Sequence, residues 1–222
     1  MQIIENITNK KNSEAHKSTI QKICFDKLKV NPLPNKKNEI WRMASKTKLA
    51  NFLNYKLSDD FYNPIFPYDM ENQDSLRIII GENKEIYYKK ETYEIKILEE
   101  KKIINLIKQK LIDCDTTENW SDLLNHYLTN KRNILGLNIS GKNIPYIEII
   151  SNSKYDLLDS KTLIINIENN TKVDMTQINI GDENSALSAS SYLFIGKDSS
   201  VNHGMISYGK NKSYIVNSLN VF

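Results

Sequence analysis

Apolar residues change their spacing part-way along this chain. In roughly the first 130 residues they recur at every third or fourth position, which is typical of amphipathic helices. This spacing predicts helices over residues 13–30, 46–55, 99–112 and 117–128. The last of these has the i, i+3, i+4, i+7, i+8 pattern of a core-facing stripe, made by Trp120, Leu123, Leu124, Tyr127 and Leu128.

Alternating apolar and polar residues predict strands between these helices. Residues 76–80 and 85–88 flank the glycine-containing turn at Gly81, so they are predicted to form a hairpin. Tyr93, Ile95 and Ile97 alternate as a further strand. A strand containing Gly136 is predicted at 133–139, after the last helix.

From residue 144 onward the apolar residues form short strands that repeat. Each apolar or glycine position of one segment recurs as a similar residue 28 positions later. The matched positions are Ile167, Val173, Ile178 and Gly181 in the first copy and Ile195, Val201, Ile206 and Gly209 in the second. A period of this length with short strands is produced by stacked coils, in which each coil buries its apolar face against its neighbours.

The pattern therefore predicts an α+β region over 1–143, followed over 144–222 by the first coils of a right-handed parallel β-helix. The same offset places Val221 opposite Leu193 and Phe222 opposite Phe194, so the sequence stops where another coil would begin. On this reading the β-helix is incomplete and the chain is a truncated or degenerate copy of a longer protein.

Composition adds little to this picture. The 222 residues carry a net charge of +3, with 26% charged and 40% hydrophobic residues, which is ordinary for a soluble protein. Lysine pairs lie among glutamates, so no basic face for nucleic acid is predicted. No apolar run approaches the roughly 20 residues of a membrane helix, and the N-terminus is unlike a secretion signal. A cytoplasmic protein without a membrane or nucleic-acid partner is expected.

The chemistry-bearing residues form no motif for catalysis or metal binding. Cys24 and Cys114 are far apart in sequence, and Cys24 falls on an apolar helical stripe, where packing is its predicted role. Of the three histidines, His16 and His126 are predicted at the surface and His203 lies in the repeat where Met175 stands in the preceding copy. No phosphate-binding loop is present. We therefore predict no catalytic, cofactor-binding or metal residue, and no enzyme activity.

Two enzyme readings remain as alternatives. The segments at 180–185 and 195–200 resemble the hexapeptide repeat of β-helix acyltransferases, and His203 would then be a general base. Separately, Ser199, His203 and Asp198 contain the residue types of a Ser–His–Asp set, but their position favours a polar turn between coils. Hexads stack three to a coil, whereas the repeat here spans 28 residues. A carbohydrate-active β-helix would need paired carboxylates, and Asp174 has only Asn202 at the equivalent position.

One stretch resembles a known family. The sequence LPNKKNEIWR at 33–42 is similar to the LP…(K/R)xExW(K/R) stretch near the start of SufD proteins, and the order of the later elements is similar along the whole chain. The residues that carry the resemblance are Leu33, Pro34, Glu39, Trp41 and Arg42. Met43 and Ala44 depart from it, because the family usually has an aromatic residue and threonine there.

The resemblance implies a non-catalytic scaffold in a SufB–SufC–SufD complex that assembles iron–sulfur clusters. It implies SufB-like and SufC-like partners, and a cluster that belongs to the complex rather than to this chain. In the family, the remainder of the β-helix and a C-terminal helical region make the contacts with SufB and with the ATPase SufC. No partner-binding residue of the family can be assigned to this chain from those parts. Glu39 and Trp41 are predicted to have either a structural or a partner-contact role.

Overall fold

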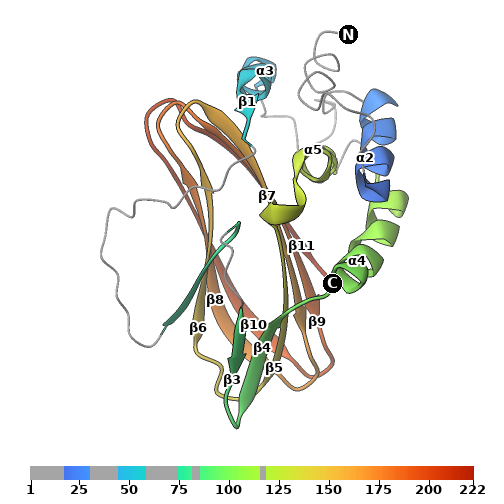
Figure 1. Cartoon of the computed structure of the whole chain (residues 1–222), viewed down its shortest axis with the longest axis vertical. Coiled ribbons are helices and arrows are strands. Elements are labelled where there is room, and N and C mark those ends of the chain that lie inside the picture. Colours follow the sequence, from blue (N-terminus) through green and yellow to red (C-terminus); the bar gives the residue numbers. More distant parts are fainter. Residues whose placement is uncertain (1–17, 31–44, 59–74, 82–85, 116–118) are drawn as a thin grey trace.

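The computed structural model describes residues 18–30, 45–58, 75–81, 86–115 and 119–222. Two stacks of parallel strands form a solenoid, and a layer of helices lies along one side of it (Figure 1). The helices are α2 (Thr19–Val30), α3 (Lys46–Asn54), α4 (Glu100–Asp113) and α5 (Trp120–Leu128), and a short 3-10 helix spans Lys131–Asn133.

Within the described ranges, eleven strands make two sheets, which we call sheet A and sheet B. Sheet A has the order β11-β9-β7-β5-β4-β3, with β1 paired to β7, and sheet B has the order β10-β8-β6-β2. The strands are β1 (Lys56–Leu57), β2 (Ser75–Ile79), β3 (Tyr87–Lys89), β4 (Tyr93–Ile97), β5 (Ile134–Gly141), β6 (Tyr146–Ser153), β7 (Leu157–Ile167), β8 (Lys172–Gly181), β9 (Ala186–Ile195), β10 (Ser200–Gly209) and β11 (Tyr214–Val221). From β6 on, the chain alternates between the sheets, so each coil contributes one strand to each.

The 28-residue repeat corresponds to one complete coil of the solenoid. Val201 pairs with Val173, Ile206 with Ile178 and Gly209 with Gly181 in the parallel register of β10 and β8. Val221 pairs with Leu193, and the rings of Phe194 and Phe222 stack with their centroids 5.1 Å apart. The predicted β-helix and its register are therefore confirmed.

Left-handed backbone marks the corners of the coils. Among the described non-glycine residues, positive φ values between 49° and 59° occur at Asn143, Asp156, Asn170, Asn184, Asp198 and Lys212. Asparagine and aspartate adopt this conformation more readily than other non-glycine residues, which explains five of these six corners. Side chains also bond from coil to coil at the corners: Asn184 Nδ2 donates to Asp156 Oδ1 at 3.0 Å.

Apolar side chains pack in two places, inside the coils and between the coils and the helices. The interior, which we call the lumen, contains Ile147, Ile149, Leu163, Ile165, Val173 and their neighbours. On the outer face of sheet A, α5 packs across β7, β9 and β11, and α2 packs on α5. Trp120 and Tyr127 of α5 are fully buried there, which explains the wide apolar stripe of this helix.

The predicted hairpin between residues 76–80 and 85–88 is wrong. β2 pairs in parallel with β6 in sheet B, and β3 pairs antiparallel with β4 in sheet A. Ile78 and Ile80 are buried in the lumen, so burial inside the solenoid outweighs the local turn at Gly81. The hairpin of this region is β3–β4 instead.

The predicted helices and the β4 strand agree with the structure where it describes them, and the fold class is confirmed: a helical and mixed region precedes the coils of a parallel β-helix. The coils already begin at Ile134, because β5 pairs in parallel with β7, and β2 provides the matching strand of sheet B. Division into 1–143 and 144–222 stays a prediction about domains.

Candidate functional site

The residues that carry the family resemblance, Leu33, Pro34, Glu39, Trp41 and Arg42, lie outside the described residues. Their predicted structural or contact role therefore stays a prediction. Among the described residues, the strongest candidate for a functional surface is the last coil, β10 and β11, which we call the open rung.

The open rung presents two strand edges and several apolar side chains. β10 ends sheet B and β11 ends sheet A, and neither has a neighbour on its outer edge within the described part of the chain. An unpaired edge offers backbone N–H and C=O groups to another strand. The exposed apolar residues of the rung are Ile206, Tyr208, Leu219, Val221 and Phe222, each at least 41% exposed.

The sequence of the open rung lacks the usual protection of an edge. Neither SVNHGMISYG of β10 nor YIVNSLNV of β11 contains a charged residue or a proline. Free edges are normally guarded by lysine, proline or a bulge, which disfavour pairing with another chain. The surface is therefore suited chemically to adding strands.

Asp122 on α5 holds β11 in place from the side. Its carboxylate accepts hydrogen bonds from Ser218 Oγ and, at 3.2 and 3.3 Å, from Asn220 Nδ2. Ser218 Oγ is also 3.0 Å from Ser190 Oγ of the coil before. Asp122 is only 4% exposed, so these bonds compensate the cost of burying its polar atoms. The helix layer thus fixes the position of the open rung.

His126 lies one turn further along α5 and is buried, so its predicted surface position is wrong. Its Nε2 is 2.9 Å from the hydroxyl of Tyr192 on β9, and their rings are 5.3 Å apart. Burial lowers the pKa of His126 to about 4, partly offset by the charge of Asp122. The imidazole is therefore neutral at pH 7. Because α5 packs on sheet A over its whole length, a polar residue beside Tyr127 becomes part of the interface.

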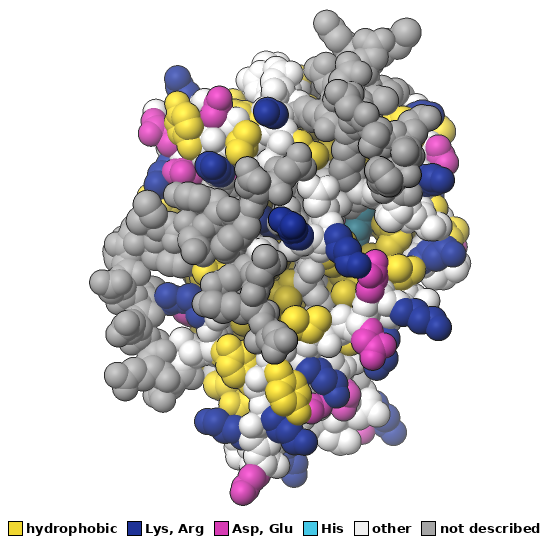
Figure 2. Space-filling model, viewed as in Figure 1, with side chains coloured by type: hydrophobic (Ala, Val, Ile, Leu, Met, Phe, Trp, Pro, Cys, Tyr) yellow, Lys and Arg dark blue, Asp and Glu magenta, His cyan; other side chains and the backbone are white. Residues whose placement is uncertain are grey.

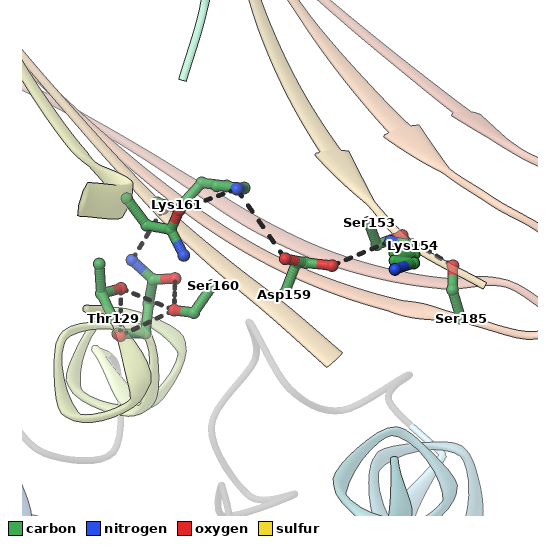
Figure 3. A network of polar contacts seen from close by, with 9 residues as sticks. Thr129, Ser153, Lys154, Asp159, Ser160, Lys161 and Ser185 are labelled. Atoms are coloured by element: carbon green, nitrogen blue, oxygen red, sulfur yellow. Dashed lines mark hydrogen bonds and ion pairs between the residues drawn. The ribbon is translucent and has the colours of Figure 1, made fainter. Parts of the chain in front are cut away.

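A second polar group joins α5 to β7 (Figure 3). Asn125 Nδ2 donates to the carbonyl of Lys161 at 3.0 Å and to Thr162 Oγ1 at 2.8 Å, and Ser160 Oγ donates to Asn125 Oδ1 at 2.7 Å. Thr129 completes the group through Ser160, with 2.6 Å between their hydroxyl oxygens. All of these side chains are buried and bonded, which is the pattern of a fixed interface rather than of a reactive site.

Lys161 and Asp159 point to the other side of β7, into the lumen. Lys161 is 2% exposed, its Nζ donates to Asn133 Oδ1 at 2.9 Å, and it lies 3.9 Å from Asp159 Oδ1. Asp159 Oδ2 accepts from the backbone N–H of Lys154 at 2.9 Å (Figure 3). Burial lowers the pKa of Lys161 and raises the pKa of Asp159, and each charge partly offsets the effect on the other.

The cysteines lie between α2 and the end of α4. Cys24 is fully buried, which confirms its predicted packing role, and burial raises the pKa of its thiol. Cys114 is half-buried, and Lys27 Nζ donates to its carbonyl and to that of Ile112, each at 2.7 Å. The described residues contain no group of three or more His, Cys, Asp or Glu side chains placed to hold a metal ion.

The serine set considered from the sequence is not assembled. Ser199 Oγ donates to the carbonyl of Glu168 at 2.8 Å and accepts from the N–H of Thr171 at 3.1 Å, so it fixes a corner of the coil. His203 pairs in register with Met175, as the repeat predicts, and its Nε2 has no hydrogen-bond partner in the described chain. Each coil has two strands rather than three hexads.

Charged side chains of both signs are visible on one face of the molecule (Figure 2). On the face shown in Figure 2, basic and acidic side chains alternate around the described part of the molecule and do not gather in one basic patch. Asp174 accepts from Asn202 at 2.6 Å, so the two equivalent positions form a carboxylate–amide pair. Across the described ranges, none of the helices combines the length and apolar character required to span a membrane.

Comparison with known proteins adds no relative. A scan against family models, a search of curated proteins and a search of solved structures each found no match.

Proposed function

We propose that this chain is a non-catalytic scaffold subunit of a SUF-type iron–sulfur cluster assembly complex. The resemblance of residues 33–42 to SufD proteins and the parallel β-helix support the family. The open rung carries the proposal of a scaffold role, because its two uncharged strand edges are suited to pairing with strands of another protein.

The partner at the open rung is proposed to be the SufB-like subunit. A strand-rich partner would satisfy the free backbone groups of β10 and β11 together, and would cover Ile206, Leu219 and Val221, which are 54%, 41% and 54% exposed. Burial of this apolar area would stabilise the complex by the hydrophobic effect.

The SufC-like ATPase and the cluster enter at the level of the complex. The resemblance implies an ATPase subunit, and we assign it no surface on this chain. Iron and sulfide are cargo of the assembly in this proposal, and the chain contributes a rigid frame on which the SufB-like subunit is held.

Co-expression with SufB-like and SufC-like proteins tests the proposal. We expect the SufB-like protein to co-purify with the tagged chain, and Leu219→Lys to weaken the complex at least about tenfold. Lysine at the half-exposed Leu219 can reach water in the free chain, whereas a docked strand would bury its charge. Val30→Lys is the matched control, because Val30 is 76% exposed on α2. Absence of the complex with the wild-type chain would refute the proposal.

The acyltransferase alternative has its own test. Binding of acyl-CoA by the purified chain, lost in His203→Ala, would replace the scaffold proposal by an enzyme. We expect no acyl-CoA binding, because Ser199 is used in a corner of the coil and His203 has no catalytic partner among the described residues.

A further inference from the structure

The lumen is apolar in one half and polar in the other. At one level of the solenoid, Ser191 Oγ of β9 donates to Gln177 Oε1 of β8 at 2.7 Å, which shows that these two side chains meet across the lumen. Side chains alternate along a strand, so Asn179 and Ala189 also point inward, each two residues away. Ser151 and Lys161 stand at the same places one coil earlier, because Ser151 pairs with Asn179 and Lys161 with Ala189.

These four residues share one level of the lumen, and we call this position the lumen cell. Ser151 and Asn179 lie side by side on sheet B, and Lys161 and Ala189 lie side by side on sheet A. Neighbouring strands within a sheet are about 4.8 Å apart, and the Ser191–Gln177 contact one level away shows that side chains of the two sheets meet across the lumen. Ser151 and Asn179 are 0% exposed, and Lys161 and Ala189 are 2% exposed, so the cell is closed to bulk solvent.

Two buried polar atoms of the lumen cell have no hydrogen-bond partner within the described chain: Ser151 Oγ and Asn179 Nδ2. Asn179 Oδ1 is used, since it accepts from Gln177 Nε2 at 3.2 Å. The Lys161 ammonium has three protons, of which one bonds Asn133, while Asp159 is beyond hydrogen-bond distance at 3.9 Å. Leaving such groups unsatisfied inside a protein is costly.

The next coil has a direct hydrogen bond at the positions equivalent to Asn179 and Ala189. There Ser207 and Asn217 replace Asn179 and Ala189, and Asn217 Nδ2 donates directly to Ser207 Oγ at 2.9 Å. In the lumen cell the asparagine faces an alanine, so the serine hydroxyl that bonds the asparagine in the next coil has no counterpart. A water molecule is nearly the same size as that hydroxyl group.

We propose that the lumen cell binds one water molecule as a permanent part of the fold. The water accepts from Asn179 Nδ2 and Lys161 Nζ and donates to Ser151 Oγ, which gives it the three partners typical of buried water. A neutral ligand fits because the charges of Lys161 and Asp159 offset each other. The water links three coil strands, β6, β7 and β8, across the lumen.

Nuclear magnetic resonance on the full chain tests the site. In the wild type we expect the side-chain amide protons of Asn179 to show a magnetisation-transfer peak to a long-lived water. Absence of that peak, with the Asn179 amide assigned, would overturn the proposal. This measurement needs no variant, so it decides even if a substitution prevents folding.

A pair of variants on β9 gives the second test. Ala189→Ser supplies the missing hydroxyl covalently, so water-oxygen magnetic relaxation dispersion should count one long-lived water fewer than in the wild type. Ala186→Ser is the matched control, because Ala186 is on the same strand but packs with the helix layer. Its count should equal that of the wild type. An unchanged count in Ala189→Ser would contradict the proposal.

Discussion

The first and the last described coil of the solenoid present different strand edges. At the first end, sheet A turns from parallel to antiparallel: β4 pairs with β5, and β3 pairs with β4. At the other end, β10 and β11 continue the parallel register and have no outer neighbour among the described residues. Both ends are sheet edges, yet they differ in charge and in how much apolar surface they present.

Charge distinguishes the two ends. Ile95 of β4 is fully buried, while Glu94 and Lys96 on either side of it form an ion pair at 2.7 Å, and Lys89 lies on the outermost strand. The alternation of β4 therefore buries one face and puts charge on the other. The strands β10 and β11 of the open rung contain no such charges, so the first end has the charge pattern that suits a strand edge facing water.

Substitution of equivalent leucines at the two ends should give the largest difference in the free energy of unfolding. Leu135 of β5 and Leu219 of β11 occupy the same lumen column, since both register with the Leu163–Ser191 pair. Leu135 is 7% exposed and Leu219 is 41% exposed. Leu135→Ala should lower the free energy of unfolding by about 3 kcal/mol through loss of packing. Leu219→Ala should cost less than about 1 kcal/mol.

Urea unfolding of both variants measures this contrast. Equal losses would show that the open rung is packed as tightly as the first end. Addition of the docking partner should bring the two losses closer together, because Leu219 would then be buried in the complex.

Acid should loosen the helix layer that holds the open rung. The folded pKa of His126, about 4, is below its ordinary value of 6.5. Between these values the unfolded chain binds a proton that the folded chain does not, so stability falls as the pH falls. From pH 6.5 to pH 5 the loss should be about 1.5 kcal/mol. Denaturant unfolding at several pH values measures it.

Two variants show which histidine causes this pH dependence of stability. His126→Gln should abolish most of it, although Asp122 and Tyr192 remain beside the site. Burial also lowers the pKa of His203, so His203→Gln should remove a smaller part. A pH dependence that persists in His126→Gln would assign the effect to other groups.

The smallest effect is expected from substitution of a charged residue at the first end by an apolar one. Lys89→Val removes a charge from the outermost strand, β3, and should raise self-association in sedimentation experiments, with stability changed by less than about 0.5 kcal/mol. Lys172→Val is the control, because exposed Lys172 lies on β8, between two other strands. If both variants show the same degree of self-association, the charge on the edge strand does not prevent association at the first end.

The sequence predicted those features that repeat or that depend on local periodicity. The 28-residue offset gave the register of β8 with β10 and of β9 with β11, because stacked coils place equivalent residues directly on one another. Strand β4 followed from its alternation. The pairing of β2 with β6 was missed, since residues far apart in sequence are brought together by burial of Ile78 and Ile80 in the lumen.

The polar contacts of α5 were also beyond sequence reasoning. Asp122, Asn125 and His126 stand on a helix whose apolar stripe was recognised, but nothing in their spacing indicates that their partners are on β11, β7 and β9. One signal was available and unused: asparagine or aspartate recurs at 156, 170, 184 and 198, which are four of the left-handed corners. That half-coil period would have located every turn between β6 and β10.

The recurrence of those corners sets how this fold can change in length. Equivalent corners lie one coil apart, as Asp156 and Asn184 or Asn170 and Asp198. Excision of residues 172–199 would join Thr171 to Ser200, the register partner of Lys172, and would leave every remaining side chain aimed as before. Loss or gain of an odd number of residues within a strand would turn lumen side chains toward solvent. Descendants of this gene are thus expected to grow or shrink by whole coils.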